Sequence, residues 1–170
     1  EEIYTLASLP SSVRWDTRDD ILDPGHGEVI NLQITPFKEI FTGDENFFKN
    51  TMHMRWFHTF QSMPDFTLAL RGKLGSIWGA DTQDIPADER YYAGGGGSIR
   101  GYPYQSVGPL RDEDPIGGGS LLELSAEMRL KWTKNWGSVF FLDGGNSYKK
   151  KLPDTDERLF WCCGLWLRYF

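Results

Sequence analysis

The clearest alternation of apolar and polar residues in the chain is that of Ser120-Leu121-Leu122-Glu123-Leu124-Ser125-Ala126-Glu127-Met128-Arg129-Leu130-Lys131-Trp132. Apolar residues at even positions from Leu122 to Trp132 alternate with polar residues at odd positions from Glu123 to Lys131. Successive side chains of a β-strand point to opposite faces. This stretch is therefore predicted to be a strand with one apolar face and one polar face, and Glu127 lies on the polar face.

Similar alternation recurs on both sides of this stretch. Asp143 shares a face with Val139 and Phe141, in a segment that a tight turn at residues 133–135 connects to residues 120–132. The other connections are predicted to be short at residues 62–65 and longer at residues 38–49, 80–119 and 148–157. The seven predicted strands cover residues 12–18, 28–37, 50–61, 66–78, 120–132, 136–147 and 158–170. The fold class is therefore predicted to be all-β and antiparallel.

Two architectures fit this alternation. In a soluble β-sandwich the apolar faces pack on a core, whereas in a membrane barrel they face lipid and the polar faces line a wet lumen. Strands of about ten residues or more suit the barrel. So do the short connections that alternate with long ones, and the mid-strand charges of both signs, such as Arg71 and Glu127.

The longest predicted connection contains Ala93-Gly94-Gly95-Gly96-Gly97-Ser98-Ile99-Arg100-Gly101-Tyr102. Glycine permits a positive φ and a close backbone approach, and this loop is far longer than an ordinary strand connection. We hypothesise that the stretch passes through a crowded space and delivers Arg100 to Glu127 and Asp143. The alternative is that Arg100 lies on a solvated loop tip and that the glycines only make the loop flexible.

Composition limits the classes of function. The chain has 170 residues, a net charge of −6 and a pI of about 5.0, which argues against a phosphate-binding surface and so against nucleic acid as a partner. The glycines do not fit a dinucleotide-binding motif, because Arg100 stands where a third glycine is needed. An arginine aimed at Glu127 and Asp143 would keep both ionised, which opposes a glycosidase acid. We therefore expect no enzyme activity, no cofactor and no metal site.

The glycine-rich stretch also carries a family resemblance. Tyr91-Tyr92-Ala93-Gly94-Gly95-Gly96-Gly97-Ser98-Ile99-Arg100-Gly101-Tyr102 resembles the sixth extracellular loop of the BamA/TamA outer-membrane assembly family, and its four glycines are more similar to TamA. Three further stretches resemble the family's twelfth, thirteenth and fourteenth strands, in that order. They are Ser125-Ala126-Glu127, Phe141-Leu142-Asp143-Gly144-Gly145-Asn146 and Gly164-Leu165-Trp166-Leu167-Arg168-Tyr169. Trp15-Asp16-Thr17-Arg18-Asp19 resembles the eighth strand.

The resemblance implies a fold and a site. The fold is a transmembrane β-barrel of sixteen strands, of which residues 1–170 match about seven, with residues 80–119 as the in-folding loop and no POTRA domain in this chain. The implied inner-wall partners of Arg100 are Glu127 and Asp143. The implied loop motif comprises Gly94, Gly95, Gly96, Gly97, Ile99, Arg100, Gly101 and Tyr102.

The resemblance also implies a function in the bacterial outer membrane. That function is the folding and insertion, or the translocation, of client β-barrel or autotransporter proteins. The implied partners are the lipid bilayer, the clients and an inner-membrane-anchored TamB-like protein. The alternatives are a barrel that translocates a fused passenger, such as a patatin-like lipase, and a soluble β-sandwich binding module.

Overall fold

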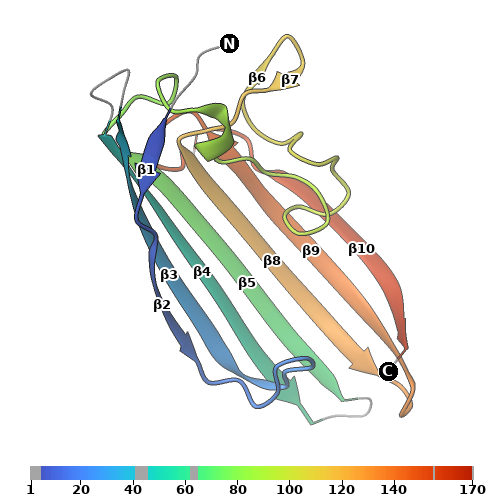
Figure 1. The fold of residues 1–170 in the computed structure, drawn as a ribbon. Coiled ribbons are helices and arrows are strands. Elements are labelled where there is room, and N and C mark those ends of the chain that lie inside the picture. Colours follow the sequence, from blue (N-terminus) through green and yellow to red (C-terminus); the bar gives the residue numbers. More distant parts are fainter. Residues whose placement is uncertain (1–4, 41–45, 62–64, 155, 170) are drawn as a thin grey trace.

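The structure is a computed structural model that describes residues 5–40, 46–61, 65–154 and 156–169. These ranges form ten strands and one short 3-10 helix (Figure 1). The elements are β1 (Leu6–Ser8), β2 (Ser11–Asp16), β3 (His26–Glu39), β4 (Asn46–Phe60), β5 (Phe66–Trp78), η1 (Ala87–Glu89), β6 (Leu110–Arg111), β7 (Asp114–Pro115), β8 (Ser120–Lys131), β9 (Trp136–Tyr148) and β10 (Phe160–Tyr169).

Eight strands form one antiparallel sheet in the order β1-β3-β4-β5-β8-β9-β10, with β2 also paired to β3. β1 and β2 are two parts of one edge strand, because Ser8 pairs with Phe37 and Ser11 pairs with Ile34 in the same register. The Leu9 N–H bridges the gap between them by donating to the Pro36 carbonyl over 3.2 Å. The predicted all-β, antiparallel fold is confirmed.

The two faces of the sheet have the reverse of the burial expected for a soluble protein. On β8 the apolar Leu124 and Met128 are 43% and 38% exposed, whereas Glu123 and Ser125 are only 1% and 8% exposed. A β-sandwich would need a second sheet over the apolar face. Among the described residues, the other sheet is the two-stranded β6–β7 hairpin, which is too small to cover that face. The uncovered apolar face is that of a barrel wall facing lipid.

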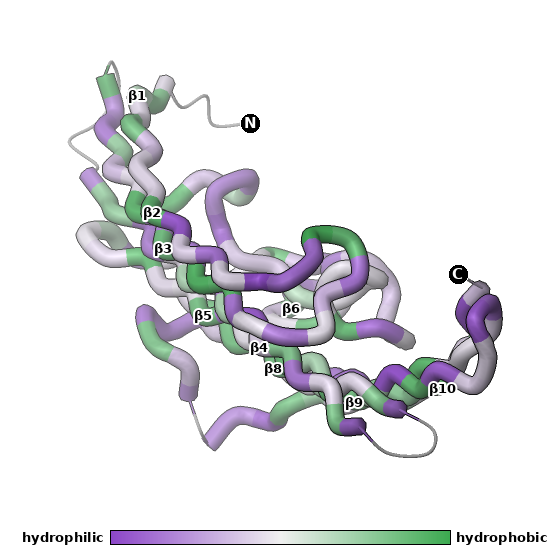
Figure 2. Tube along the Cα trace, turned by 90° about the horizontal axis from the view of Figure 1, so that it is seen from below, coloured by the Kyte–Doolittle hydropathy of each residue, from purple (hydrophilic) through white to green (hydrophobic). Residues whose placement is uncertain are grey.

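The sheet is curved, and the glycine-rich loop lies on its concave side (Figure 2). Because β1 and β2 lie at one edge and β10 at the other, the described strands form an open arc and not a closed barrel. Neighbouring strands pair over up to 13 residues, as β3 and β4 do, which keeps the wall in a single register. This arc fixes the polar side chains of β5, β8 and β9 beneath the loop.

A small hydrophobic core joins the loop to the concave face near one end of the sheet. Ile99 of the loop and Leu121 of β8 are both completely buried in it. The core therefore depends on the loop being folded inward. Its buried members are Phe37, Phe47, Ile77, Ala80, Ile85, Tyr91, Ala93, Ile99, Val107 and Leu121.

The structure differs from the prediction mainly at strand ends. β3 and β4 extend to Glu39 and from Asn46, so the connection predicted at residues 38–49 is much shorter. β1, η1 and the β6–β7 hairpin were not predicted. Most of the turn predicted at residues 62–65 lies outside the described residues, as does Phe170 of the last strand. Within the described part of the chain, no helix is long and apolar enough to cross a membrane.

Candidate functional site

The glycine-rich loop is fixed at both ends before it reaches the site. Tyr91 pairs with Gly118, and Ala93 pairs with Val107, in isolated antiparallel bridges. The Tyr91 hydroxyl donates to the Asn50 carbonyl over 2.7 Å. Its ring lies over Gly75 of β5, where an added Cβ would come within 2.5 Å of the ring. The absence of a side chain at Gly75 of β5 thus leaves the space in which the Tyr91 ring packs and holds the start of the loop.

The four glycines have two different structural roles. Gly94 and Gly95 have φ values of +105° and +99°, which L side chains rarely adopt. A Cβ on Gly94 would also lie 2.6 Å from the Pro103 carbonyl oxygen. A Cβ on Gly96 or Gly97 would meet no other atom within 4 Å. The first two glycines therefore shape the turn, and the second two leave open space at its tip.

The Arg100 side chain lies over the paired strands β8 and β9 and forms hydrogen bonds to side chains of both. Its Nε and Nη2 donate to the two oxygens of Asp143 at 2.5 and 2.6 Å, and its Nη1 donates to Glu127 Oε1 at 2.6 Å. Nη2 also donates to Ser125 Oγ at 3.0 Å, and the Arg100 backbone N–H donates to Asp143 over 3.0 Å. This planar fork forms a two-nitrogen pair with Asp143 and still has a third nitrogen for Glu127, whereas a lysine has only a single nitrogen.

The surroundings of Arg100 make this network rigid. The guanidinium carbon lies 3.9 Å from the centroid of Phe141 and 4.9 Å from that of Trp166. Asp143 has no exposed side-chain surface, and only 14% of the Arg100 side chain is exposed. The second oxygen of Glu127 accepts two bonds from Arg129, at 3.0 and 3.1 Å. Two cations and two anions therefore balance on the concave wall.

A second group of contacts holds the loop just before Arg100. The Arg71 guanidinium of β5 donates to the carbonyls of Gly97 and Ser98 at 2.5 and 2.6 Å. The Ser98 hydroxyl donates to the buried carboxylate of Glu123 and accepts the Gly94 N–H at 2.9 Å. The chain from Gly97 to Arg100 is thus tied in turn to β5, β8 and β9.

The remaining motif residues fill the space around these bonds. Ile99 is fully buried, and an added Cβ on Gly145 of β9 would come within 3.1 Å of its side chain. Gly101 has a φ of +86°, and a Cβ there would lie 2.3 Å from Cys162 Sγ. Tyr102 donates from its hydroxyl to the Trp161 carbonyl over 3.2 Å. These contacts bring β10 into the site, which the sequence did not indicate.

The structure thus places the sequence-derived residues Arg100, Glu127 and Asp143 in one ion-pair network. Sequence reasoning missed Ser98, Ser125, Arg71 and Glu123 as members of the site. The alternation had marked the last three as polar-face residues, but only the path of the loop decides which of them it meets. No group of three or more His, Cys, Asp or Glu side chains in the described ranges is arranged to hold a metal ion.

The family of the chain follows from comparison with known proteins. A family model described as the Omp85 superfamily domain matches residues 1–169. The chain belongs to the Omp85 superfamily. The crystal structure of BamA from Haemophilus ducreyi lacking POTRA domains 1–3 matches 95% of this Omp85 chain with a TM-score of 0.77. Since the two are 20% identical and the match covers 36% of that chain, this likeness shows the barrel fold alone.

Curated relatives of this Omp85 chain are found in bacteria and in yeast. Outer membrane protein assembly factor BamA of Neisseria meningitidis serogroup B is 34% identical over 122 residues, which are 65% of this chain and 15% of that protein. BamA of Nitratidesulfovibrio vulgaris is 30% identical over 132 residues, 75% of this chain and 16% of that protein. A SAM50-like protein of Schizosaccharomyces pombe is 24% identical over 123 residues, 71% of this chain and 26% of that protein.

These comparisons confirm the predicted family and the predicted location in the bacterial outer membrane. The narrower resemblance to TamA stays a prediction, because the relatives named above are BamA or SAM50-like proteins. The chain spans about a quarter or less of the curated relatives that it matches.

Proposed function

We propose that residues 1–170 form a portion of the barrel domain of an outer-membrane assembly factor. In this proposal the parent protein helps client β-barrel or autotransporter proteins to fold and insert. It does so without catalysing a covalent reaction. Two relatives that are named outer membrane protein assembly factors support the proposal at the level of the family.

The observation that carries the proposal is the fixed position of the glycine-rich loop on the concave wall. Arg100 bonds to β8 and β9 at once, so the loop holds two neighbouring strands of the wall together. A wall braced in this way can keep its shape while strands elsewhere in the barrel open to offer edges to a client. We further propose an inner-membrane-anchored TamB-like protein as a partner of the parent.

The experiment that tests the function uses the full-length parent protein in lipid vesicles. A small outer-membrane barrel, unfolded in urea, is diluted into vesicles with and without the parent. Folding is followed by the shift in electrophoretic mobility between unheated and heated samples. The parent is expected to raise the initial rate of client folding at least several-fold over empty vesicles.

Two controls separate assembly from other effects of a barrel protein. Vesicles that contain an unrelated outer-membrane barrel at the same density should give the rate of empty vesicles. Equal rates with the parent, the unrelated barrel and empty vesicles would contradict the proposed function. A parent that folds no client but exports its own fused domain would support the passenger alternative.

A further inference from the structure

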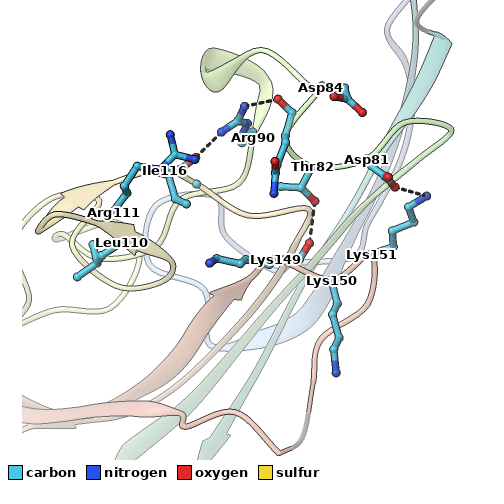
Figure 3. A pocket seen from close by; sticks show the side chains of 12 residues that line it. Asp81, Thr82, Asp84, Arg90, Leu110, Arg111, Ile116, Lys149, Lys150 and Lys151 are labelled. Carbon is cyan, nitrogen blue, oxygen red and sulfur yellow. Dashed lines mark hydrogen bonds and ion pairs between the residues drawn. The ribbon is translucent and has the colours of Figure 1, made fainter.

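A cavity of about 880 Å³ lies at the long-loop end of the sheet (Figure 3). It shares no lining residue with the smaller cavity beside Arg100. One wall comes from the two ends of the long loop at residues 80–119, which contribute residues 81–84, 110–111 and 116–117 together with Arg90. The other wall is Lys149-Lys150-Lys151, directly after β9. The volume lies within the range of cavities that bind small ligands. We call this cavity the cationic pocket.

The charge of the cationic pocket is opposite to that of the whole chain. Five of its lining residues are cationic, and only Asp81 and Asp84 are acidic. The chain as a whole carries a net charge of −6. A cavity lined by charges of mainly one sign concentrates the opposite ion from solution. The five cationic residues are Arg90, Arg111, Lys149, Lys150 and Lys151.

Arg90 is held in place without being neutralised. Its guanidinium donates to the carbonyls of Ile85, Ile116 and Gln83 over 2.7, 2.9 and 3.0 Å. Carbonyl groups orient the guanidinium but carry no net charge to cancel it. No carboxylate in the described ranges forms an ion pair with Arg90, so its positive charge remains available at the pocket wall.

Arg111 and Lys149 are also free to meet an anion, whereas Lys150 and Lys151 each have a carboxylate partner. Arg111 and Lys149 have no ion-pair partner within the part of the chain that the structure describes. Lys151 lies 3.6 Å from Asp81, whose side chain is 83% exposed, and exposed pairs of this kind contribute little. Lys150 pairs with Asp154 and is itself largely exposed. These cations repel one another, and a bound anion would relieve that repulsion.

We propose that the cationic pocket binds a phosphate group, carried either by a lipid headgroup or by a soluble phosphorylated sugar. Phosphate suits the pocket because it carries up to two negative charges and several strong acceptors, and arginine binds it through two parallel bonds. The volume exceeds that of a phosphate ion, so the attached sugar also has space. The pocket lies at the long-loop end, which faces the outside of the cell in outer-membrane barrels.

The test uses the full-length protein and three probes. Inorganic phosphate and glucose 1-phosphate are titrated by calorimetry into detergent-solubilised protein. Nanodiscs with and without lipid A provide the lipid arm, and bound lipid A is counted by native mass spectrometry. Arg111→Gln and Lys149→Gln are each expected to weaken binding of at least one probe about tenfold or more, the usual effect of losing a charge-assisted bond.

Matched variants distinguish a pocket from general charge attraction. Lys134→Gln removes one charge from an exposed turn at the opposite end of the sheet, and it should leave binding unchanged. Asp81→Asn removes an anion from the pocket and should strengthen binding, a gain that misfolding cannot produce. Lys149→Arg should retain binding.

The pattern among the probes identifies the source of the phosphate. Binding of lipid A alone that depends on Arg111 and Lys149 assigns the pocket to a headgroup. Binding of glucose 1-phosphate in detergent assigns it to a soluble ligand. The proposal is overturned if no probe binds, or if Lys134→Gln weakens binding as much as Lys149→Gln does. Neither result depends on assembly activity.

Discussion

Arg100 illustrates how one side chain can fix a long loop. It replaces water around Asp143 with three hydrogen bonds from a single residue, one of them from the backbone. A buried carboxylate left without its partner is costly because the protein interior solvates charge poorly. The contribution of this network to the free energy of unfolding is therefore best measured by removing Arg100 alone and then Arg100 and the Asp143 charge together.

We predict that Arg100→Met destabilises the parent barrel by about 3–5 kcal/mol, the usual cost of leaving one partner of a buried pair. The double variant Arg100→Met with Asp143→Asn should recover much of this loss, because it removes the unpaired charge. The urea midpoint of unfolding in lipid vesicles measures both effects, and protease cleavage in the loop reports its release. Equal stability of Arg100→Met and wild type would show that the loop is not held by these bonds.

The glycine run allows a sharper comparison. Gly94→Ala should cost roughly 1–2 kcal/mol for its left-handed backbone alone, with a further cost from the nearby Pro103 carbonyl. Gly96→Ala should be tolerated, since its added Cβ meets nothing within 4 Å. Urea unfolding of the two variants side by side checks this. If the alanine at position 96 destabilised as much as the one at 94, the run would act through flexibility and not through shape.

Part of the site could be predicted from the residues alone. The alternation put Glu127 on the polar face of its strand, and ordinary hairpin pairing across the tight turn put Asp143 on the same side of the next strand. The glycines indicated an arginine carried to a fixed place. The contacts of Ser98 and Arg71 could not be predicted. They depend on the path of a loop whose turns are set by long-range packing, such as the Tyr91 ring on Gly75.

At the scale of elements, alternation located the strand interiors well and their ends poorly. The fourth predicted strand has the same bounds as β5, Phe66–Trp78, because a glycine and a polar turn delimit it. β3 extends two residues beyond the predicted end because Glu39 is buried on the same face as Thr35 and Phe37. No local pattern distinguishes such an extension from a loop. β6 and β7 have two residues each, too few for a period to appear.

The turn between β2 and β3 is organised by one carboxylate. Asp19 Oδ1 accepts the N–H groups of Asp20, Gly25 and His26 at 2.9 to 3.0 Å. Hydrogen bonds to the charged form, the largest of them from the His26 N–H, lower the pKa of Asp19 below its ordinary value of 3.8. This turn lies at the end of the sheet opposite to the glycine-rich loop (Figure 1).

We predict that this turn weakens in acid. Because folding lowers the pKa of Asp19, its contribution to stability is complete above the unfolded value of about 3.9 and is lost as the pH falls through the lower folded value. Asp19→Ala should therefore unfold at lower urea than wild type at pH 7, and the two should converge towards pH 2. Asp156→Ala in an exposed loop is the control. A gap between Asp19→Ala and wild type that is constant from pH 7 to pH 2 would contradict this account.

At the scale of the whole molecule, the described sheet is a wall with two unpaired edges. One edge is formed by β1 and β2, and the other by β10. Each edge has backbone N–H and C=O groups that no described strand satisfies, and in hydrocarbon each such group costs several kcal/mol. The exposed apolar face requires lipid, and the edges require further strands. The sheet is therefore stable only when its apolar face contacts lipid and further strands pair with both of its edges.

This combination leads to a prediction for the isolated segment. Residues 1–170 refolded alone into detergent micelles should self-associate through their edges, whereas the full-length parent should give a barrel that resists unfolding in unheated gel samples. Size-exclusion chromatography with light scattering measures the first property, and the electrophoretic mobility shift on heating measures the second. A charged residue pointing outward on an edge strand discourages pairing, so Leu165→Lys on β10 should reduce the self-association. A monodisperse, heat-modifiable monomer formed by the segment alone would show that the arc can close on itself, and the bracing of β8 and β9 by Arg100 would then belong to a smaller barrel.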